Sequence, residues 1–389
     1  MSAELHPEAS VVMPCLNEAD TLGTCIEKAK RAFETSGIRG EVVVADNGST
    51  DGSREIAVRA GARMIPVEVR GYGSALMAGI AAARSEFVIM GDADDSYDFG
   101  EVPRFVDELR KGCDLVQGCR LPSGQGRIEP GAMPLLHRWI GNPMFSALAR
   151  HWFDAPIHDV YCGLRGFRRE FQQSLDQRCT GMEFATEMII KASLRRARFA
   201  EVPITLHRDG RKSHAPHLKT FRDGWRTLRF FLLFSPRWLF LIPGLLLIAL
   251  GLAGYAIAMP GLRIAGIAFD AHTLLFASLF LICGFQAALF WIMTKVFAIN
   301  EGLLPEDPRL NRFFALVNLE KGLVLGGVAM VVGIVLLVSA IFAWVQVDFG
   351  ALDYPHAMRR VVPGVTLTAL GFQAILSGFF TSLLGMKRK

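Results

Sequence analysis

The sequence of 389 residues has little net charge, few cysteines, and no repeat or low-complexity tract. Its formal charge of +5 is small and dispersed, which argues against a nucleic-acid-binding protein. The seven cysteines form no CxxC pair and no zinc-type spacing, and their odd number argues against a full set of disulfides. We therefore expect a reducing compartment for the folded part, and the polar stretch 1–10 predicts no signal peptide.

Charged residues are missing from four long apolar stretches of the C-terminal half, 238–262, 271–294, 322–347 and 361–386. At about 1.5 Å per residue in a helix, each is long enough to cross the ~30 Å hydrocarbon layer of a bilayer. Their glycine and serine content suits close helix packing in lipid. Because they lack Asp, Glu, Lys and Arg, a transport pathway is disfavoured. The sequence therefore predicts an all-α membrane domain of four transmembrane helices.

Lysine and arginine are unevenly distributed over the segments that flank these stretches. Fourteen lie in 211–237, in the loop between the second and third stretches, and in the C-terminal tail. Only Arg263, Arg359 and Arg360 lie in the other two loops. Because Lys and Arg accumulate on the cytoplasmic side, this predicts a multi-pass protein of the cytoplasmic membrane with its N-terminal domain and both termini in the cytoplasm.

The segment 216–237, directly before the first predicted span, mixes basic and aromatic side chains. Arg222, Arg226 and Arg229 recur at helical spacing with aromatic residues between them. This pattern predicts an amphipathic helix in the headgroup layer, with a surface helix packed on the soluble domain as the alternative. The expected boundaries are 1–215 for the soluble domain, 216–237 for the interfacial helix and 238–389 for the membrane domain.

Short apolar runs alternate with helix-length segments in the N-terminal half. The runs, interpreted as buried strands, are 10–13, 41–45, 63–67, 87–90 and 114–117. The helical patterns between them are 20–36, 53–60, 74–83 and 101–109. This alternation predicts an α/β domain with a mainly parallel, Rossmann-like sheet covered by helices on both faces. Ligands of such sheets bind at the carboxyl ends of the strands, where polar residues also gather in this sequence.

The most specific polar cluster follows the fourth apolar run. Asp92 and Asp94 flank Ala93, so a turn can aim both carboxylates at one hard cation such as Mg²⁺ or Mn²⁺. Such a cation also binds a nucleotide diphosphate and neutralises charge on a leaving group. The alternative is an acidic surface turn, because aspartate is common in turns.

A second cluster follows the second run, where Asp46 is succeeded by a Gly/Ser turn and a helix. A carboxylate in this place suits recognition of a base or ribose, and we assign Asp46 to a ligand and Asp51 to capping of the helix. The glycine-rich turn 70–74 has two interpretations, a close approach of the backbone to a diphosphate or a plain loop.

In this order the motifs resemble the GT-A glycosyltransferases of family 2, and within them the polyprenyl-phosphate branch typified by dolichol-phosphate mannose synthase. The residues that carry the resemblance are Pro14, Asn17 and Glu18 of a PxxNE motif, Asp46, the Asp92-Ala93-Asp94 DxD motif, Arg120 of a GxR motif, and Asp159 to Arg165 of a DxxSGhR-like motif. The resemblance covers about residues 9–215 at motif level. It implies a GT-A fold and inverting, metal-dependent transfer of a hexose from a nucleotide sugar to polyprenyl (undecaprenyl or dolichyl) phosphate.

The resemblance also implies roles for single residues. It places Pro14, Asn17, Glu18, Asp46 and the DxD residues at the nucleotide sugar, and Asp92 and Asp94 at the metal. Arg120 and Arg138 match positions that bind the acceptor phosphate, and Arg165 is a further cation for that phosphate. The catalytic residues are then Asp92, Asp94, Arg120 and Arg138. Arg211 and Lys212 match a loop that closes over the diphosphate.

Departures from the family pattern leave part of the function open. Leu16 stands where many members have Tyr, Cys162 where many have Ser, and the loop 207–214 differs from the commoner RxxGxSK. The donor therefore stays open between GDP-mannose and UDP-glucose, and a homo-oligomer is possible. One alternative is a processive polysaccharide synthase; such enzymes carry a QxxRW motif, and this sequence has the Arg138-Trp139 pair but not the Gln. The other is a non-enzymatic lipid-sugar flippase or scaffold.

Overall fold

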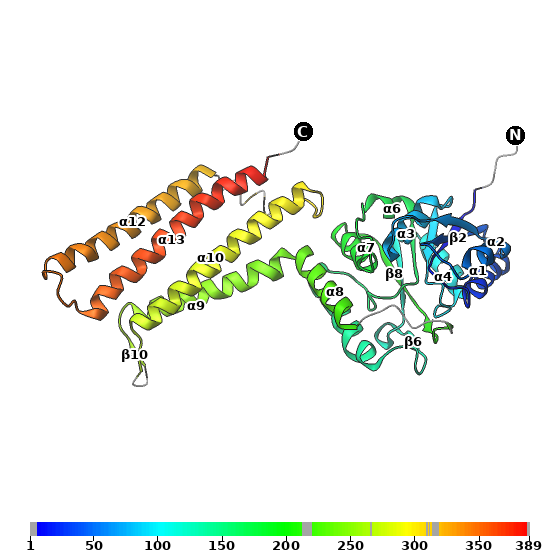
Figure 1. Ribbon diagram of the computed structural model, residues 1–389, viewed down its shortest axis with the longest axis horizontal. Coiled ribbons are helices and arrows are strands. Elements are labelled where there is room, and N and C mark those ends of the chain that lie inside the picture. Colours follow the sequence, from blue (N-terminus) through cyan, green and yellow to red (C-terminus); the bar gives the residue numbers. More distant parts are fainter. Residues whose placement is uncertain are drawn as a thin grey trace. The chain divides into compact units, whose positions relative to one another are not determined.

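The computed structural model of the protein describes residues 6–211, 220–264, 267–308, 310, 312 and 319–386. The chain divides into two compact units, Met1–Phe231 and Leu232–Lys389. The first contains a mixed α/β fold and the second is mainly helical (Figure 1). Lys212, predicted at the diphosphate, lies outside the described residues.

A seven-stranded sheet forms the centre of the first unit, in the order β3-β2-β1-β4-β7-β5-β8. The strands are β1 Ala9–Cys15, β2 Gly40–Asp46, β3 Arg63–Pro66, β4 Phe87–Met90, β5 Leu115–Cys119, β7 Arg165–Arg168 and β8 Phe199–Pro203. All neighbouring pairs are parallel except those of β7, which runs antiparallel between β4 and β5. A separate parallel pair joins β6 Arg127–Ile128 to β9 Thr205–Leu206. The predicted mainly parallel sheet is confirmed, and β7 and β8 are additions to the five expected strands.

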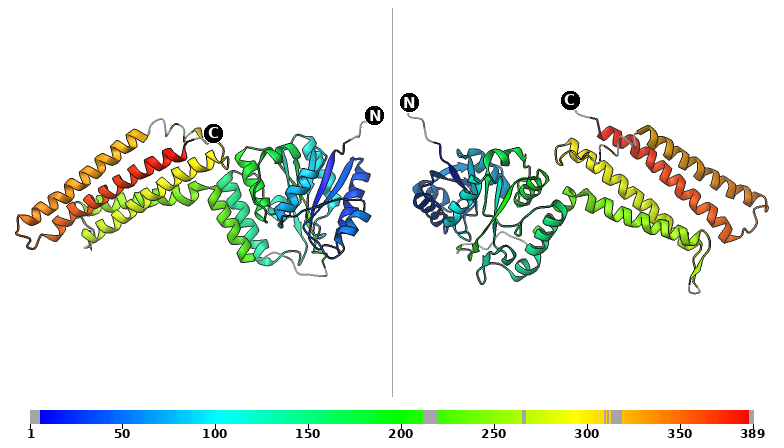
Figure 2. Two further views of the ribbon diagram at one scale, coloured as in Figure 1. Left: turned by 45° about the horizontal axis from the view of Figure 1, so that its top comes forward. Right: turned by 180° about the vertical axis from the view of Figure 1, so that it is seen from behind.

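Helices cover both faces of this sheet (Figure 2). The helices of this unit are α1 Leu22–Ser36, α2 Ser53–Arg59, α3 Tyr72–Ala82, α4 Val102–Arg110, α5 Asn142–Phe153, α6 Arg169–Ser174 and α7 Glu183–Leu194, and α8 Thr220–Phe234 follows at the boundary of the two units. Leu22, Ile26 and Phe33 of α1 recur at helical spacing and share one core with Val11 of β1. Val12 points to the opposite face, where Gly79 of α3 comes so close that a Cβ there would lie 2.5 Å from its methyl carbon. Alternation along β1 therefore feeds two separate helical layers.

The helix α8 carries part of the segment expected at the membrane interface. Its Phe231 is fully buried and packs on Phe145 and Phe153 of α5, with ring centroids 5.9 and 5.5 Å apart. Trp225 and Leu233 of the same helix are exposed. One face of α8 thus belongs to the first unit, as in the alternative of a packed surface helix, while exposed apolar side chains remain for an interface.

Four helices of the second unit, within the described residues, are long and apolar enough to cross a membrane. They are α9 Ile242–Ala258, which continues a π-helical turn from Arg237, α10 Ala271–Asn300, α12 Leu319–Val345 and α13 Tyr354–Leu384. A short hairpin of β10 Arg263–Ile264 and β11 Ile267–Ala268 joins α9 to α10. The four predicted spans are confirmed as helices, although α13 begins before its apolar run and therefore includes Arg359, which donates to Asp270 over 3.4 Å.

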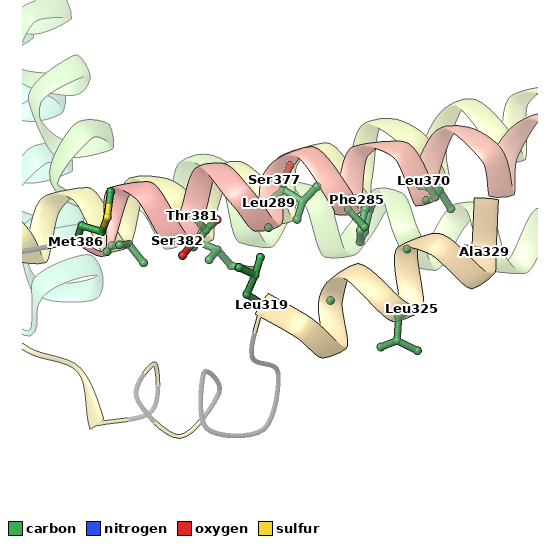
Figure 3. Close-up of a pocket in the computed structure, with 18 residues that line it drawn as sticks. Phe285, Leu289, Leu319, Leu325, Ala329, Leu370, Ser377, Thr381, Ser382 and Met386 are labelled. Carbon is green, nitrogen blue, oxygen red and sulfur yellow. The ribbon is translucent and has the colours of Figure 1, made fainter. Parts of the chain in front are cut away.

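Glycines bring the membrane helices together in pairs. A Cβ on Gly244 of α9 would lie 2.9 Å from the carbonyl oxygen of Gly284 on α10, and one on Gly326 of α12 would lie 3.0 Å from that of Gly371 on α13. The expected close packing is therefore present. A groove of about 820 Å³ remains between α10, α12 and α13, and Phe285, Leu289 and Leu319 are among its lining side chains (Figure 3).

Candidate active site

The two aspartates after β4 are held by different partners. One oxygen of Asp92 accepts a hydrogen bond from the Tyr72 hydroxyl at 2.8 Å. Oδ1 of Asp94 accepts hydrogen bonds from the backbone N–H and the hydroxyl of Ser96, at 3.0 and 2.6 Å. The third acid, Asp95, turns toward α1 and pairs with Lys28 at 2.7 Å. The loop thus separates two carboxylates that share a site from one that does not.

Charge and burial perturb the first of these carboxyl groups. Burial and the neighbouring charge of Asp94 raise the pKa of Asp92 to about 6, against the lowering effect of the Tyr72 hydrogen bond. A buried carboxyl group that is next to a second carboxylate gains from a cation placed between the two. Gly163 gives Asp92 the space it occupies, because a Cβ on that glycine would lie 2.7 Å from Oδ2.

Arg211 brings a positive charge to this pair from a distant part of the chain. Its Nη2 lies 3.1 Å from Oδ2 of Asp94, and its Nη1 lies 3.1 Å from Oε1 of Glu18. Asp209 also binds the guanidinium, at 2.6 Å. Although burial lowers the pKa of Arg211, the hydrogen bond to Asp209 and the charges of Glu18 and Asp94 hold it above its ordinary value. The predicted donor-site residues Glu18, Asp94 and Arg211 therefore do meet.

The donor atoms suit a hard divalent cation. They are carboxylate oxygens, which Mg²⁺ and Mn²⁺ prefer. Among the described residues, no group of three His, Cys, Asp or Glu side chains forms a complete metal site. Two aspartates without a third protein ligand fit a cation that takes its remaining ligands from a diphosphate and water.

Asn17 joins the loop after β1 to the turn after β2. Its side-chain oxygen accepts a hydrogen bond from the Thr50 N–H at 2.8 Å, and its own N–H donates to the Ser49 hydroxyl. Its φ of 59° lies in the left-handed region, which asparagine tolerates better than most residues.

Pro14 lies inside β1, opposite Ala45. Ala93 is buried, and its carbonyl accepts a hydrogen bond from Thr21.

Asp46 differs from the sequence prediction. Its side chain is 1% exposed, and its carboxylate accepts hydrogen bonds from the N–H groups of Gly48 and Ser49 and from Arg54 Nε at 2.6 Å. Burial raises its pKa, but these hydrogen bonds lower it below the usual value overall. The carboxylate therefore holds the turn rather than facing a ligand. Asp51 accepts a hydrogen bond from the Ser53 N–H, but the N-cap residue of α2 is Gly52, so Asp51 lies one position before the cap.

The glycine-rich turn before α3 is fixed by residues that the sequence did not single out. The side chain of Asn47 donates to the Val69 carbonyl at 2.8 Å and accepts from the Gly71 N–H at 2.6 Å. Gly71 has a φ of 141°, and a Cβ there would lie 2.2 Å from the Thr180 carbonyl oxygen. Only glycine fits this close approach. The turn carries Tyr72 to Asp92, so it serves the acidic pair.

Arg120 is not placed to meet an acceptor. It is 7% exposed and forms a two-pronged ion pair with Asp159, through Nε to Oδ2 at 2.7 Å and Nη2 to Oδ1 at 2.9 Å. Its Nη1 reaches the Tyr97 hydroxyl at 3.4 Å. Burial lowers the pKa of Arg120, but the charge and hydrogen bonds of Asp159 together with the nearby Tyr97 hold the pKa well above its ordinary value. The prediction of phosphate binding and catalysis by Arg120 is corrected: this guanidinium ties β5 to the loop before β7.

Arg165 is corrected in the same way. Its side chain is fully buried, and its guanidinium donates to the carbonyl oxygens of Cys162, Val160 and Ala185. A phosphate outside the fold cannot reach it. Such a network satisfies backbone groups that the irregular loop before β7 leaves without partners in the sheet.

Arg138 has the opposite environment. It lies in a π-helical turn, His137–Gly141, and stacks over the Trp139 ring with its guanidinium carbon 5.3 Å from the ring centroid. It forms no ion pair with any described residue, and its Nε has no hydrogen-bond partner. Leu135 and Trp139 beside it are 73% and 66% exposed. A cation held among exposed apolar side chains suits an anion at a lipid surface.

Two family profiles match parts of the chain, and one relative matches almost all of it. The profile of glycosyl transferase family 2 matches residues 10–175, and that of the glycosyltransferase family 2 C-terminal transmembrane region matches 292–385. The chain is 37% identical over 385 residues to a low-salt glycan biosynthesis hexosyltransferase, Agl6, of Haloferax volcanii. This match covers 98% of the present chain and 90% of the relative. It is 36% identical over 205 residues to a dolichyl-phosphate hexose transferase of the same organism, covering 52% of this chain and 85% of the relative.

Among solved structures, the chain is similar in fold to glucosyl-3-phosphoglycerate synthase from Mycobacterium tuberculosis. The TM-score is 0.46 at 24% identity, and the match covers 58% of this chain and 79% of that one.

Proposed function

Because the chain belongs to glycosyltransferase family 2 and carries that family's transmembrane region, we propose that it transfers a hexose, mannose or glucose, from a nucleotide sugar to polyprenyl phosphate at the cytoplasmic face of the membrane. The observation that carries the acceptor class is Arg138, a guanidinium without an ion pair to any described residue in an exposed apolar turn. The dolichyl-phosphate hexose transferase among its relatives supports the same class.

The acidic pair after β4 is the proposed holder of the cation. Asp92 and Asp94 would bind Mg²⁺ or Mn²⁺, which when bound neutralises charge on the departing nucleotide diphosphate. In the ligand-free structure Arg211 provides the positive charge at Asp94. Asn17 and Glu18 lie at the carboxyl end of β1, beside the turn that follows β2. This edge of the sheet is the expected place for the nucleotide.

The acceptor explains why no general base is required. A phosphate monoester is already an anion near neutral pH, with a second pKa of about 6, so its oxygen attacks without losing a proton to the protein. The chain must then hold that oxygen beside the anomeric carbon, on the face opposite the leaving diphosphate, which inverts the configuration. Arg138 is the proposed holder, in place of Arg120 and Arg165.

The function is tested with the purified full-length chain, undecaprenyl phosphate, and radiolabelled GDP-mannose and UDP-glucose in separate reactions. We expect label from one donor to appear in the organic phase only when Mg²⁺ or Mn²⁺ and the lipid are both present. Absence of lipid-extractable label with either donor would contradict the proposal, and a water-soluble polymer would favour the processive synthase instead.

Arg138→Ala is expected to raise the KM for polyprenyl phosphate by about tenfold or more while the KM for the nucleotide sugar changes less than twofold, because one charge-assisted contact is worth about 1.5–3 kcal/mol. Initial rates measured while each substrate is varied in turn give both constants. Arg138→Lys should recover part of the loss, because it restores the charge but not the planar fork. Arg59→Ala on the exposed surface of α2 is the matched control. Equal loss for both substrates would assign Arg138 to another task.

Tyr72→Phe is expected to weaken Mn²⁺ binding by about two- to tenfold, because it removes the hydrogen bond that orients Asp92 and keeps its pKa down. Without that bond the pKa of Asp92 rises further, so more of the carboxyl group is protonated at pH 6 than at pH 8. The deficit should therefore widen as the pH falls. Mn²⁺ titrations followed by electron paramagnetic resonance at both pH values measure it, and equal affinities at both would contradict the role given to Tyr72.

A further inference from the structure

The guanidinium of Arg211 and a cation at Asp94 require the same oxygen atom. Oδ1 of Asp94 is already occupied by two hydrogen bonds from Ser96. Oδ2 accepts from Arg211 Nη2 at 3.1 Å. A divalent ion approaching this carboxylate from the site therefore meets a protein cation in its place.

Arg211 is held there by more than its own side chain. The Gly210 N–H donates to the Asp94 carbonyl at 2.9 Å, and the His207 N–H donates to the Ser96 carbonyl at 3.0 Å. A Cβ on Gly210 would lie 2.9 Å from a methyl carbon of Thr21, so the backbone approaches α1 closely. The side chain of Arg211 is only 10% exposed. The segment from His207 to Arg211 thus runs along the acidic loop and delivers the guanidinium to it.

Two positive charges at one carboxylate oxygen repel each other, so binding of the metal requires the guanidinium to leave. Without a ligand, moving the guanidinium away from Asp94 is costly, because it would lose its carboxylate partners and gain no new anion. The move becomes favourable when another anion binds nearby. The diphosphate of a nucleotide is such an anion, and guanidinium groups bind phosphate oxygens strongly.

We propose that Arg211 occupies the cation position at Asp94 in the ligand-free protein, and that it moves to the diphosphate when the nucleotide binds, so that the metal site becomes available together with the donor. This inference rests on the proposed metal-dependent function and deepens it by assigning a regulatory role to one residue. By linkage, the metal and the nucleotide then strengthen each other's binding through Arg211, beyond their direct contact.

The test measures Mn²⁺ binding to the full-length chain in detergent, by electron paramagnetic resonance of free Mn²⁺, without any sugar transfer. Arg211→Gln should bind Mn²⁺ alone on the order of tenfold more tightly than the wild type, because the competing charge is gone. With saturating UDP or GDP the difference should shrink, because Arg211 has already left Asp94 in the wild type. Equal or weaker Mn²⁺ binding by Arg211→Gln without nucleotide would overturn the inference.

A matched control distinguishes direct competition between Arg211 and the metal from a general change in the electrostatic potential of the site. Lys28→Gln removes a positive charge that pairs with Asp95 in the same loop but leaves Asp94 untouched. It should change Mn²⁺ affinity less than twofold; a rise equal to that of Arg211→Gln would overturn the inference. Arg211→Lys keeps the charge without the fork, and it should also bind Mn²⁺ more tightly than the wild type. If wild type and variants bind no Mn²⁺ even with UDP or GDP present, the metal-dependent function falls and this inference with it; unchanged affinity in Arg211→Gln alone removes only the inference.

Discussion

Asp94→Asn is expected to lower the rate of sugar transfer at least ~100-fold, the loss typical when one charge-stabilising group is removed from an active site. Asparagine has the same shape, and its carbonyl oxygen can still accept the two hydrogen bonds from Ser96. What is lost is the negative charge on the oxygen that now binds Arg211 and that we assign to the metal. The defect should therefore appear in kcat and in the metal requirement, while the protein folds and inserts normally.

The neighbouring acid provides the control for this prediction. Asp95→Asn removes the same charge one residue later, from a side chain that faces Lys28 on α1. We expect its transfer rate to stay within about twofold of the wild type, because an ion pair of this exposure contributes little. Extraction of radiolabelled lipid and melting temperatures of all three proteins measure the effect. Undiminished transfer by Asp94→Asn, or an equal defect in Asp95→Asn, would remove Asp94 from the cation site.

Asp159→Asn is expected to destabilise the first unit by about 3–5 kcal/mol, because it leaves the guanidinium of Arg120 buried without its charge partner. Asp159 is fully buried and accepts hydrogen bonds from the Arg120 side chain and from its backbone N–H. A change of this size in a unit of roughly 200 residues lowers the melting temperature by about 10 °C. Thermal unfolding of the full chain in detergent, followed by near-ultraviolet circular dichroism, measures it.

Two further variants show whether the ion pair is structural. The double variant Arg120→Leu, Asp159→Leu should be less destabilised than either single variant, because no unpaired charge remains. Asp176→Asn breaks an exposed pair with Arg178 and should cost less than about 1 kcal/mol. If Arg120→Ala instead kept its melting temperature and raised only the KM for polyprenyl phosphate, the acceptor role that we withdrew from Arg120 would be restored.

The placements on which sequence and structure agree are those that depend on local pattern. Asp92 and Asp94 follow a buried strand, and their spacing alone places both carboxylates on one turn. The four apolar stretches became helices because length and composition determine whether a segment can satisfy its backbone in lipid. The alternation of β1, α1 and β2 likewise predicted a parallel sheet, because the spacing of apolar residues within each segment indicates whether it is a strand or a helix and which side is buried.

The roles that changed depend on which partners fold around a side chain. Arg120 reads as a phosphate ligand until Asp159, 39 residues later, is seen to bind it. Asp46 reads as a ligand group until Arg54 and the turn after β2 close around it. β7 enters the sheet antiparallel between β4 and β5, and nothing in the short segment Arg165–Arg168 specifies that position. An arginine or aspartate carries the same chemistry in a site and in a buried ion pair, so its residue type cannot distinguish them.

By itself, the sequence determined the class of both units, the strand ends at which polar groups gather, and the acidic pair after β4. Only the tertiary structure decided which polar groups face one another: that Tyr72 holds Asp92, that Arg211 reaches Asp94 across 117 residues, and that Arg120 is paired with Asp159 whereas Arg138 has no ion pair to the described residues. The physical reason is range. Periodicity and hydropathy act between neighbours along the chain, whereas Coulomb interaction and desolvation depend on distances that exist only after the chain has folded.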